Sequence, residues 1–256
     1  MGHRLRLLGL YPTEESPSTM ASDDELSLSG QAFETLFIGN DGDEYVEDEA
    51  FLESHVLLLP GIATPHECEE LIAAADHWAV SHHEAVAACD ESSPLRRASF
   101  ADLDQHSRSI ASRLIARARL NLQKKLPSIA KEVFGDTIMM SDTDPASWVN
   151  RLNFAPNEPA VNIYGVGGSF PPHEDRQALT LLVPLSAASV NFEGGGTGFW
   201  APSAIRLGSD LSTTVPTLVV RPVVPGTAVL FGGSVTHAAL PVQAGTRHAF
   251  VSSFTP

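Results

Sequence analysis

The sequence predicts an α+β fold in which helices come first and a β-rich half, a barrel or a double-sheet jelly roll, follows. Before about residue 135, apolar residues recur at the spacing of one helix face. From about Arg151 onward the chain changes to short β-branched or aromatic runs separated by Gly and Pro. The 256 residues, 43% of them hydrophobic, are sufficient for one sizeable core.

Acidic residues are concentrated at the start of the chain. Residues 1–50 hold 12 acids and 2 bases, a net of −10 out of the chain's −15. A segment so rich in Ser, Asp, Glu and Gly buries little apolar surface, so we expect an acidic, flexible segment that is dispensable for chemistry. The apolar residues Phe33, Leu36, Phe37 and Ile38 of this segment could add an edge strand or lie against the helices.

The domain itself is expected over residues 51–256, with helical support over 64–135. Thr64 supplies an N-cap and Glu67 completes a capping box, so a helix should begin there, after a short strand at Val56–Leu59. A second apolar periodicity predicts a helix from about Phe100 to Lys125. We expect three arginines of this second stretch to form a solvated helix face: Arg113, Arg117 and Arg119.

The jelly-roll core is expected over residues 151–256. Within it, residues 180–183 are apolar on both faces, which is typical of a central strand. Six runs have the composition of strands: Val161–Tyr164, Leu179–Leu185, Val190–Phe192, Leu218–Val220, Thr227–Phe231 and Ala249–Phe254.

Three side chains in this half form a candidate metal site: His173, Asp175 and, 64 residues further on, His237. In an extended segment, residues i and i+2 point to the same side, so His173 and Asp175 can bind one ion while Glu174 faces away. A histidine from a neighbouring strand would complete a facial set of two imidazoles and one carboxylate. Such a set leaves positions open for a co-substrate and O2, which suits non-haem Fe(II).

Two further residues stand at defined distances from this set. Arg247 follows His237 by ten positions, and Tyr164 precedes His173 by nine. An arginine in a β-rich interior needs an anionic partner. A dicarboxylate held bidentately by the guanidinium fits that requirement.

With these residues in place, the chain resembles the prolyl 4-hydroxylase-type branch of the Fe(II)- and 2-oxoglutarate-dependent dioxygenases. The resemblance spans roughly residues 55–255 and implies a double-stranded β-helix, a distorted jelly roll, supported by N-terminal helices. Four ordered motifs carry it: Tyr164–Asp175, Phe192–Gly195, Pro225–Phe231 and His237–Arg247.

The resemblance also assigns roles to the candidate residues. His173, Asp175 and His237 would bind the catalytic Fe(II), Arg247 would pair with the distal carboxylate of 2-oxoglutarate, and Tyr164 would hydrogen-bond the same co-substrate. The family couples oxidative decarboxylation of 2-oxoglutarate by O2 to hydroxylation of an unactivated C–H, with ascorbate as a further candidate cofactor. The carboxylate of Asp175 favours hydroxylation, because halogenating relatives lack it.

Three functions stay open at this point. The first is hydroxylation of a peptidyl, prolyl-type side chain; the second is the same chemistry on a free amino acid or small metabolite. The third, a non-catalytic jelly-roll binding module, is disfavoured because all four key residues are present. The net charge of −15 argues against a nucleic-acid or membrane partner. No secretory or membrane-spanning segment is legible and only two cysteines occur, which favours a cytoplasmic location.

Two assignments depend on neighbouring elements. His248 follows Arg247, so strand alternation should point it away from the candidate site, toward packing or the surface. The unmatched loop at residues 199–217 is expected to be a surface connection, with Trp200 at the substrate entrance as the alternative. The sequence motifs do not specify the oligomeric state or the substrate.

Overall fold

The structure, a computed structural model, describes five stretches of the chain: residues 55–82, 95–139, 145–201, 214–221 and 224–256. It also gives the backbone of three strands at 6–10, 26–28 and 34–38. The remaining parts of the acidic segment, and the centre of the 199–217 loop, lie outside the described residues. The prediction that residues 1–50 are flexible therefore stays a prediction.

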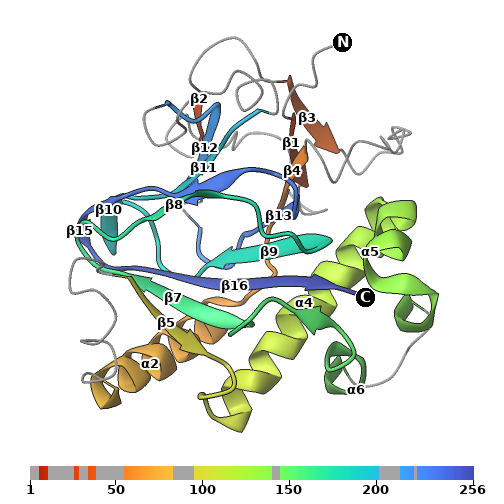
Figure 1. Ribbon diagram of the computed structural model, residues 1–256, viewed down its shortest axis with the longest axis horizontal. Helices are drawn as coiled ribbons and strands as arrows, with labels where there is room; N and C mark the ends of the chain where they lie inside the picture. Colours follow the sequence, from red (N-terminus) through yellow and green to blue (C-terminus); the bar gives the residue numbers. More distant parts are fainter. Residues whose placement is uncertain are drawn as a thin grey trace.

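Two sheets face each other across the β-rich part of the molecule (Figure 1). The larger is ordered β3-β1-β4-β13-β9-β16-β7-β5, with β6 beside β16. Its strands are β1 (Arg6–Leu10), β3 (Glu34–Ile38), β4 (His55–Leu59), β5 (Leu95–Ser99), β6 (Asn153–Phe154), β7 (Ala160–Tyr164), β9 (Leu179–Pro184), β13 (Ala228–Gly232) and β16 (Arg247–Thr255).

The smaller sheet is ordered β2-β12-β11-β14-β8, and a separate two-stranded ribbon joins β10 to β15. The strands of these two units are β2 (Leu26–Leu28), β8 (Phe170–His173), β10 (Phe192–Gly194), β11 (Thr197–Phe199), β12 (Leu218–Val220), β14 (His237–Ala239) and β15 (Val242–Gly245).

The chain alternates between the two sheets from β7 onward. It passes from β7 in the larger sheet to β8 in the smaller, returns to β9, crosses to β11 and β12, and continues through β13, β14 and β16 in the same manner. This winding is that of a double-stranded β-helix, so the predicted α+β jelly roll is confirmed. Residues far apart in sequence are thereby brought together between the sheets.

The described residues form four helices: α2 (Pro65–Ser81), α4 (Gln105–Lys125), α5 (Pro127–Met139) and α6 (Pro145–Val149). Of these, α2 and α4 lie against the outer face of the larger sheet, and α5 and α6 pack against α4 (Figure 1). The predicted capping box is present in α2, because the Thr64 hydroxyl accepts from the Glu67 N–H at 3.2 Å and Glu67 Oε2 accepts from the Thr64 N–H at 3.0 Å. The second helix begins at Gln105, capped by Asp104, and not at about Phe100, because the residues just before it form β5 beside β7.

The expectation of a solvated arginine face on α4 is wrong. Arg113 and Arg117 both bind the carboxylate of Glu67 on α2, with N–O distances of 3.0 and 2.6 Å. Arg119 is buried, and its guanidinium lies 4.8 Å from the centroid of the Trp148 ring. These arginines fasten α4 to its neighbours, and the partner acid stands some fifty positions earlier in the chain.

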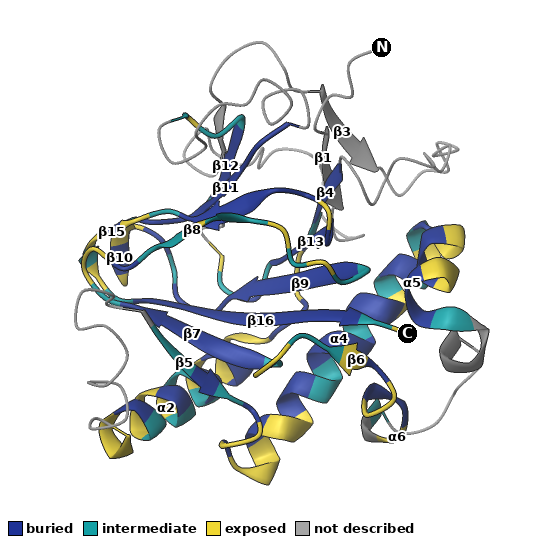
Figure 2. Ribbon diagram, in the orientation of Figure 1, coloured by how far each residue is buried: buried dark blue, intermediate teal, exposed yellow. Residues whose placement is uncertain are grey.

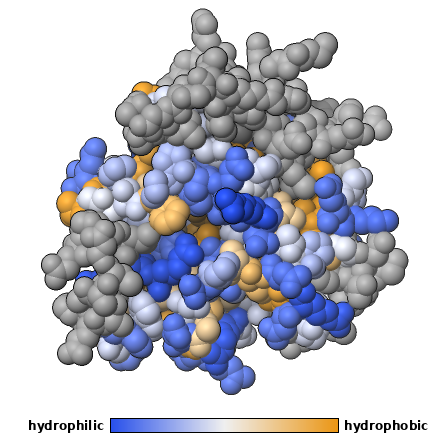
Figure 3. Space-filling view, viewed as in Figure 1, coloured by the Kyte–Doolittle hydropathy of each residue, from blue (hydrophilic) through white to orange (hydrophobic). Residues whose placement is uncertain are grey.

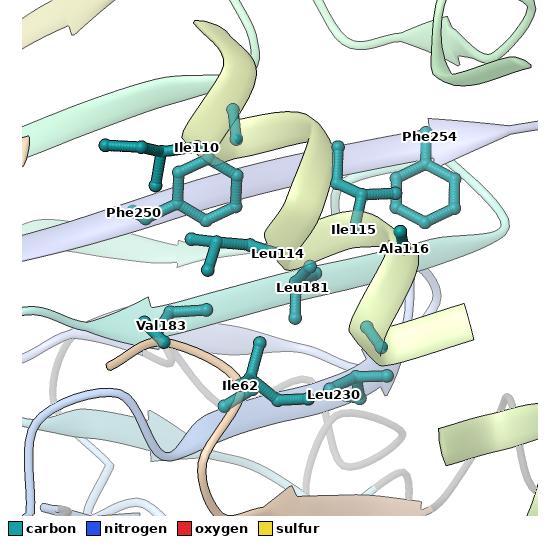
Figure 4. Packing of buried hydrophobic residues seen from close by; sticks show 14 of the residues in the cluster. Ile62, Ile110, Leu114, Ile115, Ala116, Leu181, Val183, Leu230, Phe250 and Phe254 are labelled. Atoms are coloured by element: carbon teal, nitrogen blue, oxygen red, sulfur yellow. The ribbon is translucent and has the colours of Figure 1, made fainter. Parts of the chain in front are cut away.

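The main core lies between α4 and the larger sheet. Apolar side chains of α4 interdigitate with those of β9, β13 and β16, as Figure 4 shows for Leu114, Leu181, Leu230 and Phe250. Each of these four is fully buried, and burying such a side chain stabilises the fold by about 1.5–3 kcal/mol. Figure 2 shows this pattern as buried strands flanked by helices that are exposed only on their outer faces.

The strand predictions succeeded where the runs were apolar and failed elsewhere. Five of the six predicted runs overlap strands closely, whereas Val190 is 79% exposed and β10 begins only at Phe192. The strand β8, with the sequence FPPH, was missed because two prolines remove ladder donors; it is tolerated at a sheet edge. The strands β5 and β14 were missed because they carry Arg or His side chains among their few residues.

The face drawn in Figure 3 is largely hydrophilic, with apolar residues scattered between polar ones. Among the described residues, no helix has the length and apolar character needed to cross a membrane.

Trp200 is buried, and its indole N–H donates to the Thr214 hydroxyl at 3.0 Å, so this part of the loop packs onto the domain.

Candidate metal and co-substrate site

The two predicted histidines meet across the smaller sheet. His173 ends β8 and His237 begins β14, and the two are direct partners in the strand register. Asp175 lies just beyond β8, with one oxygen 3.3 Å from His173 Nε2 and the other 3.5 Å from His237 Nε2. The three potential ligand atoms lie within 4.8 Å of one another.

Backbone carbonyls set the orientation of both imidazole rings. His173 Nδ1 lies 2.9 Å from the Pro171 carbonyl oxygen, and His237 Nδ1 lies 3.0 Å from that of Val235. Because a carbonyl can only accept, Nδ1 carries the proton in each neutral ring and the lone pair is left on Nε2. Both Nε2 atoms are directed at Asp175, which is the arrangement that binds a divalent metal.

Hydrogen bonds and a tight turn of the chain fix the position of Asp175. Its N–H donates to the Gly233 carbonyl at 3.0 Å, and one carboxylate oxygen accepts from the Thr180 hydroxyl on β9. The chain turns immediately afterwards, with Arg176 at φ 61°. A Cβ on Gly233 would lie 1.8 Å from the Gln177 carbonyl oxygen, so only glycine permits this close approach.

The protonation states of the three residues differ. Burial would raise the pKa of Asp175, but the hydrogen bond from His173, the charge of His237 and the Thr180 hydroxyl lower it to about 2. Burial lowers the pKa of His237 to about 4, despite the nearby Asp175 carboxylate. Burial also disfavours the charged form of His173, but the bond to Asp175 and the Pro171 carbonyl outweigh it and raise its pKa. At neutral pH the site thus offers a carboxylate and at least one neutral imidazole.

Arg247 begins β16 and pairs in register with Tyr164 at the end of β7. It is 3% exposed, donates to the Gly196 carbonyl at 3.0 Å and to the Thr197 hydroxyl at 3.1 Å, and lies 5.1 Å from the centroid of the Tyr164 ring. Burial lowers the pKa of this arginine. Among the described residues no carboxylate pairs with it, so the buried cation can receive an anionic ligand.

All five predicted site residues therefore line the space between the two sheets. Aromatic rings pack against His237: the Phe231 ring centroid lies 4.5 Å from the centroid of the His237 ring, and the Phe199 ring centroid lies 6.2 Å from it. His248 points the other way, as expected, and its Nε2 lies 2.9 Å from Asp76 of α2.

Three positions that matter to the site were not singled out from the sequence. Thr180 supports Asp175, Asn162 bonds the Tyr164 hydroxyl, and Arg97 bonds Asn162. The contact between Arg97 and Asn162 cannot be predicted from the local sequence, because the two residues are 65 positions apart. The spacing of Asn162 and Tyr164 could have indicated their contact, because residues two positions apart on a strand share a face.

The sequence matches no protein-family model and no curated protein. Solved structures resembling it include the viral collagen prolyl hydroxylase vCPH of Paramecium bursaria Chlorella virus-1, with 18% identity and a TM-score of 0.48 over 78% of this chain and 94% of that one. Another is a prolyl-4-hydroxylase of Pseudomonas putida, with 12% identity and a TM-score of 0.46 over 78% and 91%. A third is HygX of Streptomyces hygroscopicus, solved with nickel and 2-oxoglutarate, with 17% identity and a TM-score of 0.44 over 78% and 82%.

Two of the three are prolyl hydroxylases by name. The function proposed below rests on the geometry of the site itself.

Proposed function

We propose that this protein is an Fe(II)- and 2-oxoglutarate-dependent dioxygenase that hydroxylates an unactivated C–H. One observation carries the proposal: a facial His173–Asp175–His237 set lies between the same two sheets as buried Arg247, which has no carboxylate partner among the described residues. In this proposal the three-residue set binds a divalent metal and leaves coordination positions open. The Arg247 guanidinium binds a carboxylate.

The donor set fits Fe(II), since two imidazole nitrogens and one carboxylate converge with their lone pairs inward. When bound, Fe(II), 2-oxoglutarate and O2 supply the oxidation, in which the co-substrate yields succinate and CO2 and a C–H becomes C–OH. The chain's own contribution is positional. Arg247 holds the distal carboxylate, Tyr164 donates a hydrogen bond to the co-substrate, and the Phe199 and Phe231 rings exclude water from His237.

For the substrate, we propose a peptidyl, prolyl-type side chain. The motif from Tyr164 to Asp175 supports this choice by its resemblance to prolyl hydroxylases. The His173 side chain is 31% exposed, so the metal site can be reached from the surface of the described part of the molecule. A free amino acid or small metabolite is the second candidate, because the same exposure admits it.

The test is turnover of purified protein with Fe(II), 2-oxoglutarate, O2 and ascorbate. Succinate should form and should depend on the metal, the co-substrate and O2. His237→Ala should abolish it by removing a metal ligand, whereas His66→Ala, at an exposed histidine on α2, should not. Mass spectrometry should show a gain of one oxygen on proline-containing peptides and none on free proline. Oxygen gain on free proline alone would replace the peptide proposal, and succinate formation unaffected by His237→Ala would refute the iron site.

A further inference from the structure

A continuous chain of hydrogen bonds crosses the larger sheet and ends on Tyr164. Glu158 accepts from the Ser253 N–H, and its other oxygen binds Arg97 Nη1 at 3.3 Å. Arg97 Nε donates to the Asn162 side-chain oxygen at 2.9 Å, and the Asn162 nitrogen donates to the Tyr164 hydroxyl at 3.1 Å. The cross-strand pairing of Arg97 with Asn162 holds the middle of the chain.

The direction of every bond in this chain is fixed by the group before it. A backbone N–H can only donate, so Glu158 accepts; a guanidinium can only donate, so the group facing Arg97 Nε must be the oxygen of Asn162. The orientation of an asparagine amide is otherwise ambiguous. Here the arginine determines it, and the amide nitrogen is left facing Tyr164.

This polarity decides what the Tyr164 hydroxyl can do. Its oxygen already accepts from Asn162, so its own proton cannot be given back to that partner, which has only donors on this side. Tyr164 is 4% exposed, and its ring lies against Arg247. Among the described residues the hydroxyl donates to no other group, so its proton is available to an acceptor placed beside the Tyr164 ring and Arg247.

We propose that Arg97 and Asn162 are positioning residues that leave the Tyr164 hydroxyl free to donate to the co-substrate, because the arginine orients the amide so that it offers the hydroxyl no acceptor. This inference rests on the proposed function, since it takes 2-oxoglutarate to be the acceptor. It also predicts a specific dependence: the polarity of the Asn162 side chain matters more than its presence. A residue that merely fills space at this position would show the opposite dependence.

Two substitutions of similar size separate these roles. Asn162→Asp places an acceptor beside Tyr164, so the hydroxyl turns its proton to the introduced carboxylate and withdraws it from the co-substrate. Asn162→Leu removes the amide without offering an acceptor, so the hydroxyl keeps its proton for the co-substrate. A structural role predicts that leucine is the more damaging change, because it leaves Arg97 Nε without its buried partner.

The readout is the dissociation constant of 2-oxoglutarate, measured by calorimetry on protein loaded with Ni(II), so that no turnover occurs. Tyr164→Phe should weaken binding by about five- to tenfold, the worth of one net hydrogen bond. Asn162→Asp should weaken it at least equally, and Asn162→Leu by less than about threefold. In the double variant, Asn162→Asp should add at most about twofold to Tyr164→Phe, because the hydroxyl it diverts is already absent.

Each result decides between the roles. Additive effects of Asn162→Asp and Tyr164→Phe would overturn the proposal, because a pure charge effect of aspartate acts without the hydroxyl. Stronger damage from Asn162→Leu than from Asn162→Asp would also overturn it, in favour of packing. If Tyr164→Phe binds as tightly as wild type, the inference fails while the proposed function stands on Arg247. If the wild-type protein binds no 2-oxoglutarate at all, the proposed function fails as well.

Discussion

At the scale of single residues, the site is built from groups whose chemistry is set by the backbone. The Pro171 and Val235 carbonyls select the tautomers of His173 and His237, and the Thr180 hydroxyl holds one oxygen of Asp175. None of these supporting contacts needs the metal to be present. In the proposed metal site, these contacts would orient the three side chains without help from the ion, which would lower the entropy lost when it binds.

Metal affinity should fall as the pH is lowered, and His173 should set where this happens. Its pKa is raised above the ordinary 6.5, whereas those of His237 and Asp175 are lowered to about 4 and about 2. A proton on Nε2 competes directly with the ion, so binding is complete above the pKa of His173 and weakens by about tenfold per pH unit below it. Titration with Co(II) from about pH 5 to about pH 8 would measure this, a range that brackets the ordinary histidine pKa.

Replacing His66, an exposed histidine on α2, should leave that pH profile unchanged. A profile that stays flat to the acid end of the titration would show that His173 does not lose a proton on binding. It would then have to be removed from the ligand set.

Arg247 should control the affinity for the co-substrate and not for the metal. Removing one partner of a buried charge pair costs about 2–5 kcal/mol, so Arg247→Ala should raise the KM for 2-oxoglutarate by about thirtyfold or more. The KM of Arg247→Lys should lie between those of the wild type and Arg247→Ala, because an ammonium keeps the charge but loses the bidentate geometry. Steady-state succinate formation at varied 2-oxoglutarate gives these values, with Fe(II) affinity as the internal control. An unchanged KM in Arg247→Ala would exclude this role.

At the scale of elements, how well a contact could be predicted from the sequence depended on how far apart its two residues are in the chain. The capping box of α2 is local, three residues apart, and was predicted correctly. The His173–Asp175 pair is also local, and the structure brings the distant His237 close to it, a proximity that the spacing of the family-like motifs predicts. In contrast, nothing local distinguishes Arg97 from a surface arginine, since its partners Glu158 and Asn162 stand 61 and 65 positions away.

The prediction of a solvated arginine face on α4 was wrong for the same physical reason. Their spacing suits a solvated face, and only the folded chain brings the buried Glu67 of α2 against Arg113 and Arg117. A cap residue that also binds two arginines ties the start of α2 to the middle of α4. This contact couples the two helices beneath the larger sheet.

Glu67→Gln should destabilise the protein in a pH-dependent way. Burial would raise the pKa of Glu67, but its bonds to Arg117, Thr64 and Arg113 lower it from 4.5 to about 2. A carboxylate with a lowered pKa contributes stability that is fully present above its unfolded pKa of 4.5 and is lost as the pH falls toward about 2. Since both arginines are about one-third exposed, we expect a contribution on the order of 2 kcal/mol at neutral pH.

Urea unfolding of wild type and Glu67→Gln at several pH values would measure the difference. It should be largest above pH 4.5 and shrink in acid. Glu69→Gln, on the exposed side of the same helix turn, serves as the matched control and should change stability little at any pH. A loss in Glu67→Gln that is the same in acid as at neutral pH would point to packing and not to charge.

At the scale of the whole molecule, alternation between sheets is what assembles the site. The smaller sheet contributes the histidines, the larger sheet contributes Tyr164, Thr180 and Arg247, and Asp175 contacts both. Helices support the larger sheet from its outer face (Figure 1). The site should therefore respond to changes in the strands that carry its residues and be insensitive to changes at the opposite ends of the two sheets, which β2 and β3 form.

Removal of residues 1–50 tests that independence. The strands of this segment occupy sheet ends: β1 pairs in parallel with β4, and β2 pairs with β12. The site residues lie on or beside β7, β8, β14 and β16. We therefore expect a chain beginning at Phe51 to bind Fe(II) and 2-oxoglutarate within a few-fold of the full chain. Its thermal midpoint should fall, because β4 and β12 become exposed edges, and unpaired edges promote self-association.

Calorimetry, size-exclusion chromatography and metal titration on the shortened chain would separate these effects. Leu8→Pro in the full chain is the matched variant, since proline at the middle of β1 removes a ladder donor but keeps every acidic residue. It should reproduce the fall in thermal midpoint if strand pairing is the cause. Loss of iron in the shortened chain would contradict the prediction, because it would mean that the sheet ends and the metal site fold as one unit.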